Sequence, residues 1–258
     1  MKTFFSLLVR SGSNKFSLCR YAGVIIVTLA MTGSGFAATT ITQWNFNSGT
    51  PDSSTTTGSD VPIVGSGTAL SVGGVVAFAA ANASSDPAAA ADDTGFFISS
   101  FPSQGTGDRS RGAEFMVSTA GYAGISFTFD QRNSATASQY WELQYTLDGS
   151  NWIAYSASGA NTSSGLYQFT SGSTWVNGLT ADFSSIMAAD NNALFGVRLL
   201  SAFDPTAGTS YTGTSSGYSG GGTATFDMVT FSGTAVPEPS RVALLIFGLV
   251  GFGLRRRR

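Results

Sequence analysis

Carboxylates, hydroxyls and amides are the side chains with which the central part of this chain could do chemistry. Between Ala38 and Ala235 the sequence has fourteen acidic residues, four arginines and no lysine, which gives a net charge of −10. The whole chain has no histidine, and its one cysteine is Cys19. Ser-His-Asp catalysis, Cys-His catalysis and histidine-ligated zinc are therefore excluded. The acidic surface favours divalent cations and repels phosphate backbones, so we expect no nucleic-acid partner.

Asp130, Arg132 and Glu142 bring charge to two predicted strands whose polar faces coincide if the strands pair. We expect an ion pair between Arg132 and Glu142, which at an exposed site contributes about 1 kcal/mol or less. A glycoside hydrolase or lyase would instead need two carboxylates about 5 to 9.5 Å apart beside a cleft. Such a carboxylate-dependent enzyme is the alternative function. Because fourteen acids produce close pairs by chance, we expect the protein to be non-catalytic, with no catalytic residue.

Three aromatic residues are candidates for ligand binding. Tyr211 and Tyr218 lie in a Gly/Ser-rich segment, and Trp175 lies in a predicted strand. Aromatic faces stack on sugar rings because they offer a large contact area at a low cost in entropy. These three residues predict carbohydrate binding, whereas we expect Trp141 and Trp152 to lie in the core.

Alternating hydrophobicity predicts the strands that must position these side chains. In residues 125–130 the apolar side chains occupy every second position, and residues 141–147 alternate in the same way. Both patterns are typical of half-buried strands. Asp148 and Gly149 form a turn signal, so we expect residues 140–155 to form a β-hairpin.

Further strands are expected along the rest of the central region, at residues 40–47, 69–78, 95–100, 113–118, 174–179, 194–202 and 224–232. Loops are expected at residues 48–60, 79–93 and 206–222, with room for a helical turn in the alanine-rich middle one. A short helix is expected at residues 182–189, capped by Asp182. These elements predict one all-β domain, an antiparallel β-sandwich, over residues 38–235.

The N-terminal 37 residues have the composition of a secretory signal peptide. Basic residues precede a short apolar run at residues 22–32, and small residues follow it up to Ala37. This order predicts export and cleavage after Ala37; the alternative is a retained N-terminal anchor. Cys19 lies before that point, so the mature protein is expected to contain no disulfide.

The C-terminal segment, residues 236–258, combines three features. Val236, Pro237, Glu238, Pro239 and Ser240 form a short motif, an apolar stretch at residues 242–254 follows, and Arg255, Arg256, Arg257 and Arg258 end the chain. The apolar stretch is about 20 Å long as a single helix, and the arginines predict a cytoplasmic C-terminus.

This order of motif, apolar helix and arginines resembles the PEP-CTERM sorting signal of Gram-negative bacteria. The resemblance implies recognition by an exosortase after passage through the secretion machinery, with cleavage near Pro237 to Pro239; the alternative is a plain tail anchor. The C-terminal helix would hold the protein transiently in the inner membrane, with its ectodomain in the periplasm. The protein would then reach the cell surface or an extracellular exopolysaccharide matrix, as in a biofilm.

Several central segments resemble the jelly-roll ectodomains found before such sorting signals: residues 44–47, 129–134, 141–155 and 226–231. They are also similar to the galactose-binding and concanavalin-like jelly rolls of carbohydrate-binding modules. The resemblance implies a structural calcium ion held by Asp227, with Asn45 or Asn47 near the first strand; the alternative is that Asp227 makes only hydrogen bonds. It further implies a structural or glycan-binding role, with polysaccharide as the partner.

Overall fold

A computed structural model describes residues 37–155 and 165–236. This part of the chain contains twelve β-strands and one short 3-10 helix, and no α-helix. The strands are β1 (Thr39–Trp44), β2 (Gly67–Val72), β3 (Val75–Ala80), β4 (Thr94–Ser99), β5 (Gly112–Val117), β6 (Tyr122–Asn133), β7 (Tyr140–Thr146), β8 (Trp152–Ala154), β9 (Tyr167–Gln168), β10 (Trp175–Asp182), β11 (Phe195–Ala202) and β12 (Ala224–Ala235). The predicted all-β class is confirmed.

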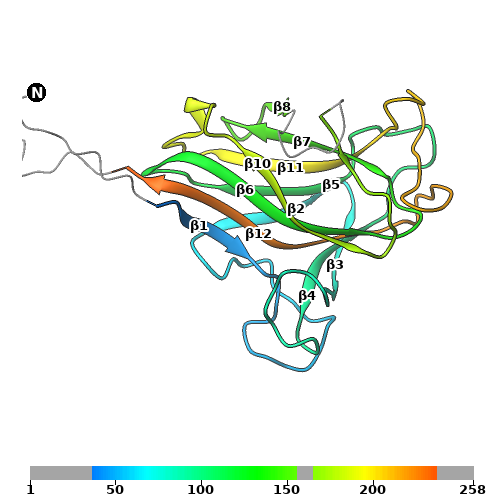
Figure 1. Ribbon diagram of the computed structural model, residues 1–258, viewed down its shortest axis with the longest axis horizontal. Helices are drawn as coiled ribbons and strands as arrows, with labels where there is room; N and C mark the ends of the chain where they lie inside the picture. The colour runs from blue at the N-terminus through cyan, green and yellow to red at the C-terminus, as the bar shows by residue number, and fades with distance from the viewer. Residues whose placement is uncertain (1–36, 156–164, 237–258) are drawn as a thin grey trace, which may run out of the picture. The chain divides into compact units, whose positions relative to one another are not determined.

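The strands form two antiparallel sheets. Sheet I has the order β10-β6-β12-β4-β3, and β1 also pairs with β12. Sheet II has the order β2-β5-β11-β7-β8, and β9 also pairs with β7. The long strands β6 and β12 run side by side through sheet I, as Figure 1 shows in green and orange. The two sheets face each other, so the prediction of an antiparallel sandwich is correct.

Aromatic side chains from both sheets fill the space between them. Phe115 of sheet II is the centre of this core: its ring lies 5.8 to 6.4 Å from those of Trp44, Phe46, Phe96, Phe127 and Phe226. All six side chains are fully buried. Because side chains alternate between the two faces of a strand, the residues that flank these rings point outward from the sandwich.

The hairpin predicted at residues 140–155 is present as β7 and β8. Asp148 forms its turn, because its carboxylate accepts hydrogen bonds from the backbone N–H groups of Ser150 and Asn151. Trp141 and Leu143 point into the core, as their alternation predicted. Trp152 differs from the expectation, since it lies half-exposed on the outer face of sheet II.

Two predicted elements are corrected. Residues 69–78 do not form one strand, because the chain passes from sheet II to sheet I between β2 and β3. Gly73 permits this turn with a φ of 62°, in the left-handed region that favours glycine. The helix expected at residues 182–189 is reduced to a 3-10 turn at Met187–Ala189, and Asp182 ends β10.

The predicted targeting segments fall largely outside the described residues. Ala37 is exposed and lies just before β1, while Val236 ends the described chain beside Gly121. The rest of the sorting motif, Arg255 to Arg258 and the expected C-terminal helix are not described. No helix within residues 37–155 and 165–236 is long and apolar enough to cross a membrane.

Candidate functional site

The outer face of sheet I carries a row of four side chains with the chemistry of a ligand-binding surface. The strand register places Trp175 beside Arg132, Arg132 beside Thr225, and Thr225 beside Phe97. Directly paired residues of antiparallel strands point to the same side of the sheet. Neighbouring strands are about 4.8 Å apart, so the two aromatic ends of the row are separated by about 14 Å.

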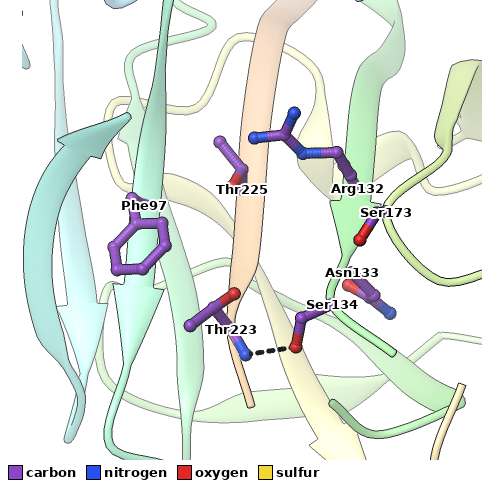
Figure 2. Close-up of a pocket in the computed structure, with 7 residues that line it drawn as sticks. All are labelled: Phe97, Arg132, Asn133, Ser134, Ser173, Thr223 and Thr225. Carbon is purple, nitrogen blue, oxygen red and sulfur yellow. Dashed lines mark hydrogen bonds between the residues drawn. The ribbon is translucent and has the colours of Figure 1, made fainter. Parts of the chain in front are cut away.

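A hollow of about 170 Å³ opens along this row. Its lining residues come from β4, β6, β12 and the adjoining loops: Phe97, Arg132, Asn133, Ser134, Ser173, Thr223 and Thr225. Figure 2 shows the guanidinium of Arg132 extending towards Thr225, with Phe97 on the neighbouring strand. Ser134 Oγ accepts a hydrogen bond from Thr223 N at 2.9 Å and joins the two strands below the hollow. The lining therefore offers hydroxyls, a cation and an aromatic ring, whereas the Asn133 amide is buried and bonded to Gln131 and Ser138.

Two contacts hold Arg132 in place. Its guanidinium carbon lies 5.0 Å from the centre of the Trp175 ring, within cation–π distance. Its Nη2 donates a hydrogen bond of 2.7 Å to the carbonyl of Ala80, the last residue of β3. Burial lowers the pKa of Arg132, although the charge of Asp93 opposes that shift. An arginine keeps its proton at neutral pH, so the hollow carries a fixed positive charge.

Next to this hollow, residues 81–93 fold over the outer face of sheet I and cover a cluster of three carboxylates. One oxygen from each of Asp86, Asp93 and Asp227 lies within 4.8 Å of the others. Asp227 is fully buried, and Asp93 is 3% exposed. Asp227 Oδ2 and Asp93 Oδ1 are buried without a hydrogen-bond partner among the described residues.

Hydrogen bonds connect this acidic cluster to three parts of the chain. Asn47, which follows β1, donates from its side chain to Asp86 Oδ2 at 2.8 Å. The side-chain oxygen Oδ1 of Asn47 accepts a hydrogen bond from Thr94 N at 2.8 Å. Asp130 accepts from Ser85 N at 2.5 Å and from Gly178 N at 2.7 Å, which fixes residues 81–93 to β6 and to the bulge in β10. The cluster thus lies where the start of the domain, its last strand and this segment meet.

Left-handed backbone conformations surround the acidic cluster. Phe46, Ala83 and Met228 have φ values of 54°, 75° and 47°, although none of the three is a glycine. Such conformations cost about 1 kcal/mol or more each and occur at binding sites. The backbone N–H of Met228 donates a hydrogen bond of 2.7 Å to Asp227 Oδ1. Oδ2 is therefore the oxygen of that carboxylate that has no hydrogen-bond partner among the described residues.

Burial and mutual repulsion change the acidity of the cluster. Burial, together with the charges of Asp86 and Asp93, raises the pKa of Asp227 to about 9, although the Ser84 hydroxyl and the N–H of Met228 act in the opposite direction. Burial and the charge of Asp86 likewise raise the pKa of Asp93 to about 6. Three hard oxygen donors with two free buried oxygens match the ligand chemistry of calcium. The residues present therefore fit the ion that the jelly-roll resemblance implies.

The calcium ligands expected from sequence are only partly brought together. Asp227 is in the cluster, and Asn47 contacts it through Asp86. Asn45 instead accepts a weak hydrogen bond from Asn47 N at 3.4 Å. Asp86 and Asp93 were missed because they lie in an alanine-rich segment predicted as a loop, without the Asp-x-Asp spacing that marks many calcium sites.

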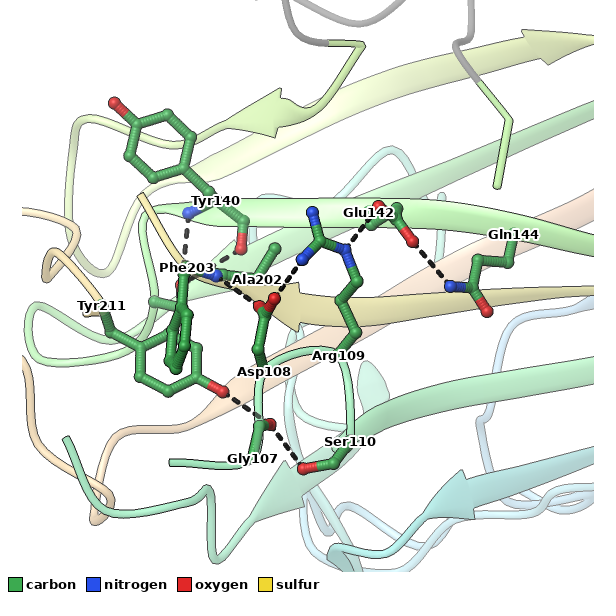
Figure 3. A network of polar contacts seen from close by, with 11 residues as sticks. Gly107, Asp108, Arg109, Ser110, Tyr140, Glu142, Gln144, Ala202, Phe203 and Tyr211 are labelled. Atoms are coloured by element: carbon green, nitrogen blue, oxygen red, sulfur yellow. Dashed lines mark hydrogen bonds and ion pairs between the residues drawn. The ribbon is translucent and has the colours of Figure 1, made fainter. Parts of the chain in front are cut away.

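The predicted ion pair between Arg132 and Glu142 is wrong, because β6 and β7 lie in different sheets. Glu142 instead accepts a hydrogen bond of 2.5 Å from Arg109, which also contacts Asp108 (Figure 3). Glu142 also accepts from Gln144 at 2.6 Å. The two carboxylates of this network are therefore engaged with one guanidinium rather than standing free on either side of a cleft.

The tyrosines expected to bind sugars pack on each other. The rings of Tyr211 and Tyr218 are stacked 4.4 Å apart, and Tyr211 is 3% exposed. Their hydroxyls donate to the carbonyls of Gly107 and Pro102, each at 2.8 Å; Figure 3 shows the first of these bonds. Tyr211 is therefore buried against Tyr218, which corrects the expectation that its ring is open for stacking on a sugar. Trp175, the third candidate, lies in the row on sheet I.

No family model matches the chain, and neither does any curated protein. Among the solved structures that are distantly similar to the chain are the following two. One holds the CBM22-1 and GH10 modules of the endo-1,4-β-D-xylanase 10B of Clostridium thermocellum in complex with xylohexaose, with 14% identity, 64% of this chain covered and a TM-score of 0.39. The other is the K1 cleaved adhesin domain of the Lys-gingipain of Porphyromonas gingivalis W83, with 12% identity, 77% of this chain covered and a TM-score of 0.35. The matches span 26% of the xylanase chain and 99% of the adhesin domain.

Proposed function

We propose that this protein is a non-catalytic, exported β-sandwich that binds polysaccharide on the outer face of sheet I. The observation that carries the proposal is the row Trp175, Arg132, Thr225 and Phe97 beside the hollow. Aromatic rings bind the apolar faces of sugars, while charged and hydroxyl groups bind their polar edges. Trp175, Arg132 and Phe97 supply both kinds of group on this one surface, whereas Thr225 is buried beneath it.

The length of the row favours an extended glycan over a single sugar. The aromatic ends are about 14 Å apart, and the polar groups lie between them. A chain of several sugars can contact both rings and the hollow together, whereas a monosaccharide reaches only one part. Arg132 adds a positive charge in an acidic domain, which suits a glycan that carries carboxylate groups.

The network around Arg109 supports a binding role over the alternative of a glycoside hydrolase or lyase. Asp108 and Glu142 both contact Arg109 on the sheet opposite the hollow, and Asp93 and Asp227, which lie beside the hollow, are buried. A hydrolase of this type uses two carboxylates that stand on either side of the bond to be cleaved.

Affinity electrophoresis with two matched variants tests the proposed function. The gels contain xylan, alginate, dextran or the exopolysaccharide of the producing culture. Trp175→Ala removes the aromatic ring that lies beneath Arg132, while Trp152→Ala removes the ring 4.5 Å from Arg198 on the other sheet. We expect retardation of the wild type in at least one gel, its loss in Trp175→Ala and its retention in Trp152→Ala. Absence of retardation in every gel, or equal loss in both variants, would refute the proposal.

For its destination, we propose export through the N-terminal signal peptide and sorting by an exosortase to the cell surface or extracellular matrix. The order of the motif, apolar stretch and arginines in residues 236–258 supports this proposal. Mass spectrometry of the protein released from the producing cells tests it. We expect an N-terminus at Ala38 and a C-terminus near Pro237 to Pro239; an intact Arg258 on the surface protein would contradict it.

A further inference from the structure

We infer that Asp86, Asp93 and Asp227 hold a calcium ion, and that this ion fastens residues 81–93 over sheet I and so positions Arg132 in the neighbouring hollow. The cation site follows from the acidic cluster itself. Its effect on ligand binding rests on the proposed function.

The arrangement of oxygens is the first reason for a cation. Three carboxylates converge within 4.8 Å, and the described residues supply no hydrogen bond to Asp227 Oδ2 or Asp93 Oδ1. Buried polar atoms in proteins are almost always paired, so two free oxygens pointing into one cluster indicate a missing partner. Ionised carboxylates this close also repel each other unless one of them takes up a proton or a positive charge lies between them. A divalent cation satisfies both conditions.

The identity of the ion follows from the ligand atoms. The site offers only oxygen donors, and the chain has no histidine. Calcium takes six to eight oxygen ligands in flexible geometry, whereas magnesium demands near-octahedral geometry and keeps several of its waters. An irregular group of carboxylates on a segment and a strand therefore favours calcium.

The site would join distant parts of the chain. Asp227 belongs to β12 in the middle of sheet I, while Asp86 and Asp93 belong to the segment between β3 and β4. Apart from the cluster, this segment is attached to the sheet through Ser85 N and Asp130, and through the carbonyl of Ala83, which accepts from Asn177. Without a cation Asp227 keeps its proton, Asp86 and Asp93 repel each other, and the segment is expected to loosen.

Arg132 connects this segment to the hollow. Its Nη2 donates to the carbonyl of Ala80, the residue just before the segment, and the charge of Asp93 acts on its guanidinium. Both ends of the segment therefore contribute to the position of Arg132. A loosened segment would leave Arg132 held mainly by Trp175, and ligand affinity would fall.

Calcium titration of the exported protein, stripped of metal with a chelator, tests the site without any glycan. Extracellular calcium modules bind with a Kd of roughly 0.1 to 1 mM, and we expect binding of this order by calorimetry. At a calcium concentration 100-fold above Kd, the Tm is expected to rise by about 5 to 10 °C. Hydrogen exchange in peptides that cover residues 81–93 is expected to slow several-fold.

Three variants separate a specific site from general charge effects. Asp227→Asn and Asp93→Asn keep the side-chain shape but each removes a ligand charge, so both are expected to lose the Tm shift and the slowed exchange. Asp60→Asn removes an exposed carboxylate outside the cluster and is expected to respond as the wild type does. If the stripped wild type shows no calcium response, or if all three variants respond equally, the cation site is refuted. Should one cluster variant fail to fold, the other variant and the wild-type titration still decide.

Polysaccharide binding measured with calcium and with chelator tests the second part. We expect at least tenfold weaker binding in chelator. Equal affinity under both conditions would refute the coupling to Arg132 but leave the cation site intact. Calcium binding without any polysaccharide binding would refute the proposed function and not the site.

Discussion

Replacing Asp227 by asparagine should change how the stability of the metal-free protein depends on pH. Asp227 is fully buried, and burial together with Asp86 and Asp93 raises its pKa to about 9 in the fold. In the unfolded chain an aspartate has a pKa of about 3.9. The folded protein therefore keeps a proton that the unfolded chain loses. The stability from this group is complete below about pH 4 and falls as the pH rises towards 9.

The size of this effect follows from linkage. One proton released on unfolding lowers the free energy of unfolding by at most about 1.4 kcal/mol per pH unit. Between pH 6.5 and 8.5 the loss would reach about 2.7 kcal/mol, or about 5 to 10 °C in Tm for a domain of this size. Asp93, with a pKa raised to about 6, is mostly ionised across this window, and Arg132 stays charged.

Thermal denaturation in chelator at several pH values between 6.5 and 8.5 measures the effect. The Tm of the wild type should fall as the pH rises across the window, while the Tm of Asp227→Asn should not. The Tm of the variant relative to that of the wild type should therefore increase with pH. Saturating calcium should reduce the wild-type slope, because the ion stabilises the ionised carboxylate. Parallel curves for the two proteins in chelator would show that Asp227 is ionised in the fold and would refute the reasoning.

Two further substitutions test the packing and the position of the site. A side chain at Gly112 would place its Cβ 1.8 Å from the backbone oxygen of Leu199, so Gly112→Ala should lower the free energy of unfolding by about 3 kcal/mol. Gly217→Ala, at a position open to solvent, is the control, and equal Tm values for the two variants would show that β5 and β11 do not approach as described. Glu142→Gln weakens the contact of this largely buried side chain with Arg109 and should cost about 1.5 to 3 kcal/mol. It should leave polysaccharide binding unchanged, and a loss of binding would place the site on sheet II.

Local patterns in the sequence predicted most of the strands and the hairpin, but not β9. Alternation at residues 125–130 and 141–147 corresponds to β6 and β7. Asp148 lies in the turn that was predicted there, and its carboxylate accepts a hydrogen bond from the N–H of Asn151. The strand at residues 69–78 was mispredicted because its apolar pattern continues through Gly73 and Gly74, where the chain changes sheets. Periodicity reports the faces of a strand but not the sheet to which it belongs.

The candidate sites depend on contacts between distant parts of the chain. Arg132 and Glu142 lie ten residues apart, yet β6 and β7 belong to opposite sheets, so their predicted pairing failed. Asp86 and Asp227 are 141 residues apart and meet only because residues 81–93 cover β12. Only Asp227 could be predicted, from its position in the last strand. The row on sheet I likewise depends on the register of four strands, which the sequence pattern does not specify.

A crystal structure of the protein with an oligosaccharide that it binds tests the central claim most directly. The ligand is predicted to lie across β10, β6, β12 and β4, in contact with Trp175 and Phe97 and with a hydrogen bond to Arg132 in the hollow. An oligosaccharide bound instead to the outer face of sheet II, over Trp152 and Arg198, would contradict the account.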